Sequence, residues 1–346
     1  MDALLKDLLN ASGISGCESE IAGIMKKELS RSCSDVSIDG FGNVIAKKGK
    51  GSRKIMIAAH MDEIGLLVKH VSKEGFINFV KIGGIDDRVL VGQRVVIKTK
   101  KGDVFGILGL KPPHLQKEEE RKKVVKHEDM FIDIGSASRE DALRRVSIGD
   151  PVIFEPNAGV LNGRLCYGKA VDNRIGCYVM IKIMEKLKAS AEVYAVATVQ
   201  EEVGLKGAKT SSFKIAPDFA LVIDTTIAGD TPHIKENESS LKLGQGVAIT
   251  LVEASGRGMI VNEKVKELII STAEKKKIKH QIDVIDGGMT DGAMIYMNRE
   301  GILTGVLSIP TRYIHASTGV FSLDDLDSAV ELGAAVIERL AAKSNG

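Results

Sequence analysis

The chain has 346 residues, of which 44% are apolar and 27% are charged, and its 48 basic side chains nearly balance its 46 acidic ones. This length exceeds what one hydrophobic core usually supports, so we expect two domains. The near-neutral charge, an aromatic content of 4% and the absence of Trp argue against a nucleic-acid groove, and no run of about twenty apolar residues could span a bilayer.

The first 29 residues are predicted to form two amphipathic helices around a Gly-rich turn. They lack the basic region, apolar core and small-residue cleavage site of a secretion signal. The four cysteines are scattered with no Cys-x-x-Cys pair, so we expect reduced thiols and neither disulfides nor a zinc knuckle. A cytoplasmic protein with no membrane partner and no nucleic-acid partner is therefore expected.

Three short apolar runs end abruptly in polar residues, as buried parallel strands do at their carboxyl ends. They are KIMIAAH at 54–60, EVYAVATVQEEVG at 192–204 and FALVID at 219–224. Between the first two, residues 173–188 carry apolar side chains at helical spacing. Strands that alternate with helices in this way predict an α/β sheet, whose polar strand ends share one crevice.

The stretch from about residue 67 to 162 has a different pattern, with short alternating runs such as VGQRVVIKTK, GDVFGILG and GDPVIFEP separated by Gly and Pro. Helical periodicity is confined to residues 140–145. This pattern is typical of a small β-barrel or sandwich. We therefore place an inserted domain at 67–162 within a larger α/β domain formed by 1–66 and 163–346. A last helix should begin after Ser322, a suitable cap.

His60 and Asp62, in AAHMDEIG, follow the first predicted strand. An imidazole is a good ligand for zinc or cobalt, and a carboxylate two residues later can support it. Asp172, in GKAVDNRIG, stands at a predicted helix entrance from which its carboxylate could project into the crevice. Each residue alone is explained as well by an ordinary strand end or a helix cap.

Glu201 and Glu202 follow the second predicted strand, where two adjacent carboxylates are costly to bury unless a cation compensates them. In an extended segment they would point in opposite directions, so one could bind a metal while the other faces a substrate water. A solvated turn is the alternative. Asp224 ends the third strand and His315 lies in an irregular segment, and each could be a simple turn residue. Together, the histidines and carboxylates are the ligand set of a two-metal hydrolase.

Five motifs, AAHMDEIG, GKAVDNRIG, VQEEVGLKGA, LVIDTT and IPTRYIHASTG, resemble in this order the metal-site motifs of the tetrahedral (TET) aminopeptidases. These enzymes are dinuclear metallopeptidases once labelled glucanases or cellulases. The resemblance implies an α/β fold, with a mixed sheet flanked by helices like that of the dinuclear zinc exopeptidases, and an inserted small β-barrel domain. It also implies two divalent ions, zinc or cobalt, in each subunit.

Carried over by position, the resemblance assigns a role to each candidate residue. Asp172 would bridge both ions, His60 and Asp224 would complete one site, and Glu202 and His315 would complete the other. Asp62 would orient His60, and Glu201 would be the general base. The segment around Asp291, DGGMTDGA, should lie near the crevice, but no role for it follows.

The resemblance further implies that N-terminal residues are released from short peptides inside a homododecamer whose dimers use the inserted barrel. A deacylase or carboxypeptidase on the same scaffold is an alternative. A non-catalytic metal-binding assembly protein is another, although the presence of Glu201 argues against it. A glycosidase would need two carboxylates that flank a sugar, and a histidine-rich metal set does not suit it.

Overall fold

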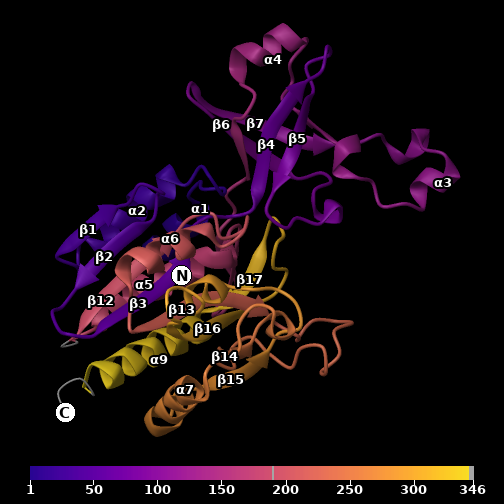
Figure 1. Cartoon of the computed structure of the whole chain (residues 1–346). Helices are drawn as coiled ribbons and strands as arrows, with labels where there is room; N and C mark the ends of the chain where they lie inside the picture. Colours follow the sequence, from indigo (N-terminus) through magenta and orange to yellow (C-terminus); the bar gives the residue numbers. More distant parts are fainter. Residues whose placement is uncertain (189–190, 343–346) are drawn as a thin grey trace.

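The computed structural model describes residues 1–188 and 191–342. It contains a large mixed sheet flanked by helices and a closed barrel that projects from it (Figure 1). The sheet has the strand order β1-β2-β12-β3-β13-β16-β14-β15. In this order the strands are β1 Asp35–Ile38, β2 Val44–Lys48, β12 Glu192–Thr198, β3 Lys54–His60, β13 Phe219–Ile227, β16 Leu303–Thr311, β14 Val247–Val252 and β15 His280–Val284. The predicted α/β fold with an inserted barrel is confirmed.

The central strands β12, β3, β13 and β16 are parallel to one another. Because parallel strands have all their carboxyl ends at one edge, the polar residues after β12 and β3 are brought together with Asp224 in the carboxyl half of β13, which continues to Ile227 beyond its predicted end. Strands β14 and β15 run in the opposite direction to β16. A separate small sheet joins β10 Gly159–Asn162, β11 Leu165–Gly168 and β17 Gly319–Ser322.

Helices cover both faces of the large sheet. Leu221 of β13 packs against Gly333 of α9. The next residue of β13, Val222, pairs with Val306 of β16, and Val306 lies against Gly292 of α8. Successive residues of a strand point to opposite faces, so α9 and α8 lie on opposite sides. The helices are α1 Ala3–Asn10, α2 Ser19–Leu29, α3 Glu118–Arg121, α4 Arg139–Arg145, α5 Val171–Lys186, α6 Lys206–Ile215, α7 Glu263–Lys276, α8 Gly292–Ile295 and α9 Leu323–Ala342.

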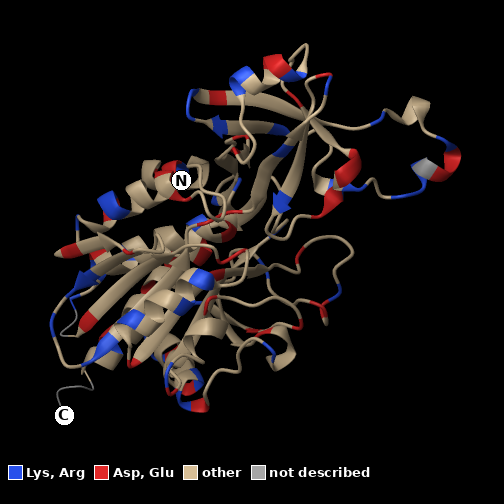
Figure 2. Ribbon diagram, turned by 45° about the horizontal axis from the view of Figure 1, so that its top comes forward, with Lys and Arg blue, Asp and Glu red and all other residues tan. Residues whose placement is uncertain are grey.

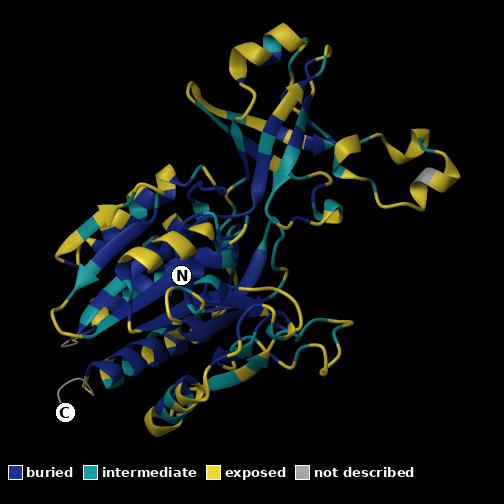
Figure 3. Cartoon of the chain, viewed as in Figure 1, coloured by how far each residue is buried: buried dark blue, intermediate teal, exposed yellow. Residues whose placement is uncertain are grey.

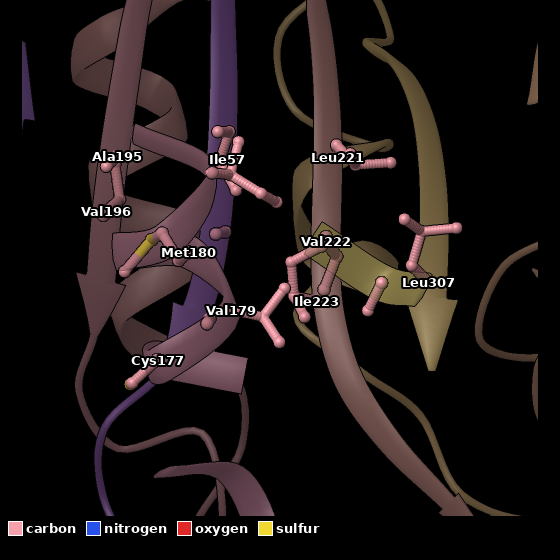
Figure 4. Packing of buried hydrophobic residues seen from close by; sticks show 14 of the residues in the cluster. Ile57, Cys177, Val179, Met180, Ala195, Val196, Leu221, Val222, Ile223 and Leu307 are labelled. Atoms are coloured by element: carbon pink, nitrogen blue, oxygen red, sulfur yellow. The ribbon is translucent and has the colours of Figure 1, made fainter. Parts of the chain in front are cut away.

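The core lies where α5 and α9 pack on the central strands. Ile57 of β3, Val179 of α5 and Ile223 of β13 are fully buried and meet there (Figure 4). β3 is apolar throughout residues 55–59, because both of its faces are covered. Burial of each large side chain contributes about 1.5–3 kcal/mol, so this core fixes the sheet edge that carries the site.

The barrel has its own core, seen as a separate buried region in Figure 3. Its six strands close in the order β4-β5-β8-β7-β6-β9. They are β4 Gly65–Val71, β5 Ile77–Ile82, β8 Phe131–Asp133, β7 Gly102–Gly109, β6 Arg94–Thr99 and β9 Pro151–Phe154. A long excursion between β7 and β8 carries α3 and extends away from the barrel (Figure 1). The 3-10 helices are η1 Asp87–Val89, η2 Pro113–Leu115, η3 His127–Asp129 and η4 Ala254–Gly256.

Basic and acidic residues are interspersed along the ribbon in both the sheet domain and the barrel (Figure 2). Among the described residues, no helix combines the length and the apolar character that a membrane span requires.

Candidate metal centre

His60 is the last residue of β3, and its imidazole is buried at the carboxyl edge of the sheet. Its Nε2 atom faces three carboxylate oxygens: Asp172 Oδ1 at 3.1 Å, Asp224 Oδ1 at 3.7 Å and Glu201 Oε2 at 3.9 Å. The partners come from the entrance of α5, from β13 and from the turn after β12. Residues far apart in the sequence therefore converge on one imidazole.

A second imidazole approaches the other oxygen of Asp172. His315 lies in the loop after β16, and its Nε2 atom is 3.3 Å from Asp172 Oδ2 and 3.5 Å from Glu202 Oε2. Asp172 thus presents one oxygen to His60 and the other to His315. Its carboxylate stands between two groups of ligand-type atoms.

Asp62 connects these groups. Its Oδ1 accepts a hydrogen bond from the backbone N–H of Glu201 at 3.0 Å, and its Oδ2 accepts one from the N–H of Glu202 at 3.2 Å. The Nδ1 atom of His60 lies 3.5 Å from Asp62 Oδ1 and 3.1 Å from the Asp62 carbonyl oxygen. The Asp62 carboxylate therefore bonds the backbone of both adjacent acids, while its carbonyl oxygen contacts the imidazole.

The two adjacent glutamates diverge, but not because they belong to an extended strand. β12 ends at Thr198, and Gln200 adopts a left-handed conformation with φ of 54°. Glu201 and Glu202 therefore lie in the turn that leads to α6. The turn sends Glu201 toward His60 and Glu202 toward His315.

The residues present fit divalent cations. Potential ligand atoms of His60, Glu201 and Asp224 all lie within 4.8 Å of one another, and so do those of His60, Asp172 and Glu202. Glu202 Oε1 is buried without a hydrogen-bond partner, as expected for an oxygen whose natural partner is a cation. Within residues 1–188 and 191–342, no Lys or Arg forms an ion pair with these carboxylates. Mixed imidazole and carboxylate sets of this kind suit zinc and related metals.

The proton affinities of the cluster lead to the same interpretation. Burial and the neighbouring Asp172 carboxylate raise the pKa of Glu202 to about 8. Burial, opposed by His60 but reinforced by Asp224, raises the pKa of Glu201 well above its ordinary value. Burial alone would lower the pKa of His315, but its bond to Asp172 and the charge of Glu202 raise that pKa to about 9. Without cations the cluster must hold protons, and divalent ions would take their place.

Two buried acids near the cluster were not given a role from the sequence. Asp291, at the start of α8, accepts a hydrogen bond from the Thr198 hydroxyl, and its Oδ1 is buried without a partner. Glu253 follows β14 and accepts from the Thr290 hydroxyl at 2.6 Å. Burial raises the pKa of Asp291 and of Glu253 to about 7 in each case, and the nearby Asp224 adds to both shifts. Glu253 could have been found from the sequence, because it directly follows an apolar run, the same pattern that pointed to Asp224.

A small cavity of about 20 Å³ opens beside His315. It is lined by Asp172, Glu202 and His315, together with Ile64 and Tyr313. This volume is enough for about one water molecule. The cavity therefore has room for a water molecule next to three of the candidate ligands, and Glu201 is not among the residues that line it.

An α/β sheet that gathers two imidazoles and several buried carboxylates beyond its strand ends defines the class of metal-dependent hydrolases. Residues 42–332 match the family described as M42 glutamyl aminopeptidase. The chain is 34% identical over 345 residues to the lysyl aminopeptidase of Pyrococcus furiosus, covering 97% of this chain and 96% of that protein. The chain belongs to the M42 family and is an aminopeptidase.

Two solved structures are similar over nearly the whole chain. The TET aminopeptidase of the marine sediment archaeon Thaumarchaeota archaeon SCGC AB-539-E09 has a TM-score of 0.95 and 41% identity, covering 99% of this chain and 96% of that one. The TET1 peptidase of Pyrococcus horikoshii, described as assembling into a tetrahedron or a large octahedral shell, has a TM-score of 0.87 and 36% identity. That comparison covers 96% of this chain and 98% of the other.

Proposed function

We propose that this aminopeptidase releases N-terminal residues from short peptides with the help of two divalent ions, zinc or cobalt. His60 and Asp224 would hold one ion, Glu202 and His315 the other, and Asp172 would bridge them. The observation that carries this assignment is that Asp172 directs Oδ1 toward His60 and Oδ2 toward His315. A single carboxylate placed between two imidazoles in this way suits a pair of ions.

When bound, such ions polarise the scissile carbonyl and make a water molecule more acidic. The protein's part is to place and move the proton. Glu201 Oε2 is the atom we assign as general base, since it lies beside His60 at the edge of the ligand cluster. It would take a proton from the attacking water and pass it to the leaving amine. Asp62 holds the Glu201 backbone in place for this transfer.

Charge favours the amino end of the substrate over the carboxyl end. Seven carboxyl groups gather at the centre: Asp62, Asp172, Glu201, Glu202, Asp224, Glu253 and Asp291. When Asp62, Asp172, Glu202 and Asp224 are ionised they balance the four positive charges of two divalent ions, so the ionised Glu201 base leaves one negative charge in surplus. The surplus attracts an ammonium group and repels a carboxylate. A carboxypeptidase or an enzyme for N-acylated substrates is therefore disfavoured.

Aminoacyl p-nitroanilides and their N-acetylated equivalents test this preference directly. We expect hydrolysis of the free-amine compounds and none of the acetylated ones. Equal release of p-nitroaniline from both would show that a free amino group is not required, whereas release of acetate with the anilide bond intact would indicate a deacylase.

Substitution of Glu201 by Gln tests its role as the base. The variant should retain its bound metal but lose most turnover, because the amide cannot accept the proton. Asp172→Ala should lose metal instead. Glu192→Gln, at the opposite end of β12, is the matched control and should behave as the wild type. Full activity in Glu201→Gln would refute the assignment.

We also propose that the chain forms a homododecamer built from dimers. In this proposal residues 67–162 form a domain inserted between 1–66 and 163–346. The barrel of this domain would be the element that joins two subunits. A groove of about 400 Å³ on the barrel supports this proposal, because it exposes the apolar side chains of Phe105 and Ile107. Size-exclusion chromatography with light scattering tests it. An active monomer as the sole species would contradict the enclosed assembly and its restriction to short peptides.

A further inference from the structure

The turn between α1 and α2, residues 11–18, lies against the candidate metal centre although it precedes the region matched to the family, 42–332. The turn is bonded to the segment after β3. The N–H of Glu63 donates to the Gly13 carbonyl at 2.9 Å, and the N–H of Ser15 donates to the Glu63 carbonyl at 3.3 Å. The position of this N-terminal turn is therefore fixed relative to His60.

Ser15 contacts the carboxylate that organises the centre. Its hydroxyl donates to Asp62 Oδ2 at 2.7 Å, and both residues are buried. The same oxygen of Asp62 accepts the N–H of Glu202. Ser15 thus helps to set the direction of the Asp62 carboxylate, and through it the position of the following turn. A buried bond to a charged acceptor is among the stronger hydrogen bonds in proteins.

Glu18 holds the chain where it turns toward the two catalytic acids. Its Oε1 accepts the N–H of Gln200 at 3.2 Å and that of Gly16 at 2.8 Å, and the residue is only 8% exposed. Gln200 has a left-handed backbone, which is unfavourable for a residue with a side chain. The hydrogen bond that the Gln200 N–H donates to Glu18 stabilises this conformation, and Glu201 follows directly.

We propose that Ser15 and Glu18 are positioning residues of the aminopeptidase, which set Asp62 and Gln200 so that Glu201 and Glu202 diverge toward their separate partners. Neither residue lines the cavity beside His315. The inference rests on the roles proposed above for Glu201 and Glu202. The N-terminal turn would then support catalysis, by positioning other residues, as well as folding.

Alanine variants test this inference, each with a conservative partner and a matched control. Ser15→Ala deletes one hydroxyl, and Ser15→Thr keeps it. Glu18→Ala removes the acceptor, and Glu18→Gln retains an oxygen. Ser12→Ala and Glu20→Ala change the same residue types in the same region, where Glu20 accepts from the N–H of Ser12 and has no bond to Gln200.

Three quantities are measured for each variant: kcat, KM for an aminoacyl p-nitroanilide, and zinc affinity in competition with a chelator. Residues that orient metal ligands typically contribute about 10–100-fold to metal affinity or activity. We therefore expect Ser15→Ala and Glu18→Ala to lower kcat at least about tenfold with little change in KM, and Ser15→Ala to weaken zinc binding about tenfold. The Thr and Gln variants should recover most of the loss, and the two controls should match the wild type.

The inference is overturned if both alanine variants keep wild-type kcat and zinc affinity, or if the controls lose as much as they do. Zinc affinity does not depend on turnover, so it separates this inference from the proposed function. A wild type without hydrolysis of aminoacyl substrates would contradict the function alone. Should Glu18→Ala fail to fold, Ser15→Ala, which removes a single oxygen atom, still decides the matter.

Discussion

Replacing Glu63 with Gln should destabilise the folded chain more than replacing Lys169 with Met. Both Glu63 oxygens lie 2.8 Å from the Lys169 ammonium, and Oε1 also lies 3.3 Å from Arg174 Nη2. None of the three side chains is more than 2% exposed. The cluster ties the segment after β3 to the entrance of α5, which carries Asp172.

The expected difference follows from which charges are left unpaired. Glu63→Gln leaves two buried cations without a counter-charge, and loss of one partner of a buried ion pair costs about 3–5 kcal/mol. Lys169→Met leaves Glu63 paired with Arg174 and with the N–H of Gly13. The loss should then be about 1–3 kcal/mol, the cost of an incompletely bonded buried group.

Stability should also depend on pH through Lys169. Burial, only partly offset by Glu63 and reinforced by the repulsion from Arg174, lowers the pKa of Lys169 to about 8 from 10.5. Between these values the unfolded chain binds more protons than the folded chain, so stability rises with pH. The gain is about 2 kcal/mol between pH 8 and pH 10, and Lys169→Met should lack it.

Denaturant unfolding at fixed subunit concentration, followed by circular dichroism, measures these differences. The fixed concentration is needed because association contributes to apparent stability. A larger loss of stability in Lys169→Met than in Glu63→Gln would contradict the proposed energetics of the buried cluster. A difference between wild type and Lys169→Met that stayed constant from pH 8 to pH 10 would contradict the lowered pKa of Lys169.

Two further predictions concern packing and thiol chemistry. A Cβ on Gly65 would lie 2.2 Å from an Ile14 methyl group, so Gly65→Ala should lower stability by about 1–3 kcal/mol in thermal unfolding. Gly40→Ala, whose Cβ would meet nothing within 4 Å, is the control, and equal losses would contradict the packing argument. Burial raises the pKa of Cys177 to about 12, and burial and the charge of Glu18 also raise that of Cys17, but only Cys17 is partly exposed, so a thiol reagent should modify Cys17 and leave Cys177 unmodified in the folded chain. Mass spectrometry reports the labelled sites, and rapid labelling of Cys177 would show that its burial is wrong.

The parts of the fold that could be predicted are the strands and helices whose residue pattern can be recognised within a short stretch of sequence. β3, β12 and β13 are continuous apolar runs because both faces of each strand are covered, and such runs can be recognised without knowing their partners. The helical spacing at 173–188 corresponds to α5, and the Gly-punctuated runs correspond to the barrel. Strand order and the antiparallel placement of β14 were not predicted, because they depend on pairings between distant segments.

The candidate site also has a part that local sequence patterns predict and a part that depends on distant contacts. His60, Asp224 and the two glutamates could be proposed because each follows or ends an apolar run. The divergence of Glu201 and Glu202 was predicted for the wrong local reason, since no sequence pattern marks Gln200 as left-handed. The contact between Glu18 and Gln200 joins residues 182 positions apart and leaves no signal in either segment. The ligand roles themselves remain predictions.

Hydrolysis measured against the number of ions bound per chain shows whether the enzyme works with a pair of metal ions. Metal-free protein is titrated with zinc or cobalt, and cleavage of an aminoacyl p-nitroanilide is followed at each step. We expect activity to reach its maximum at two ions per chain. Full activity with one bound ion, or with none, would contradict this expectation.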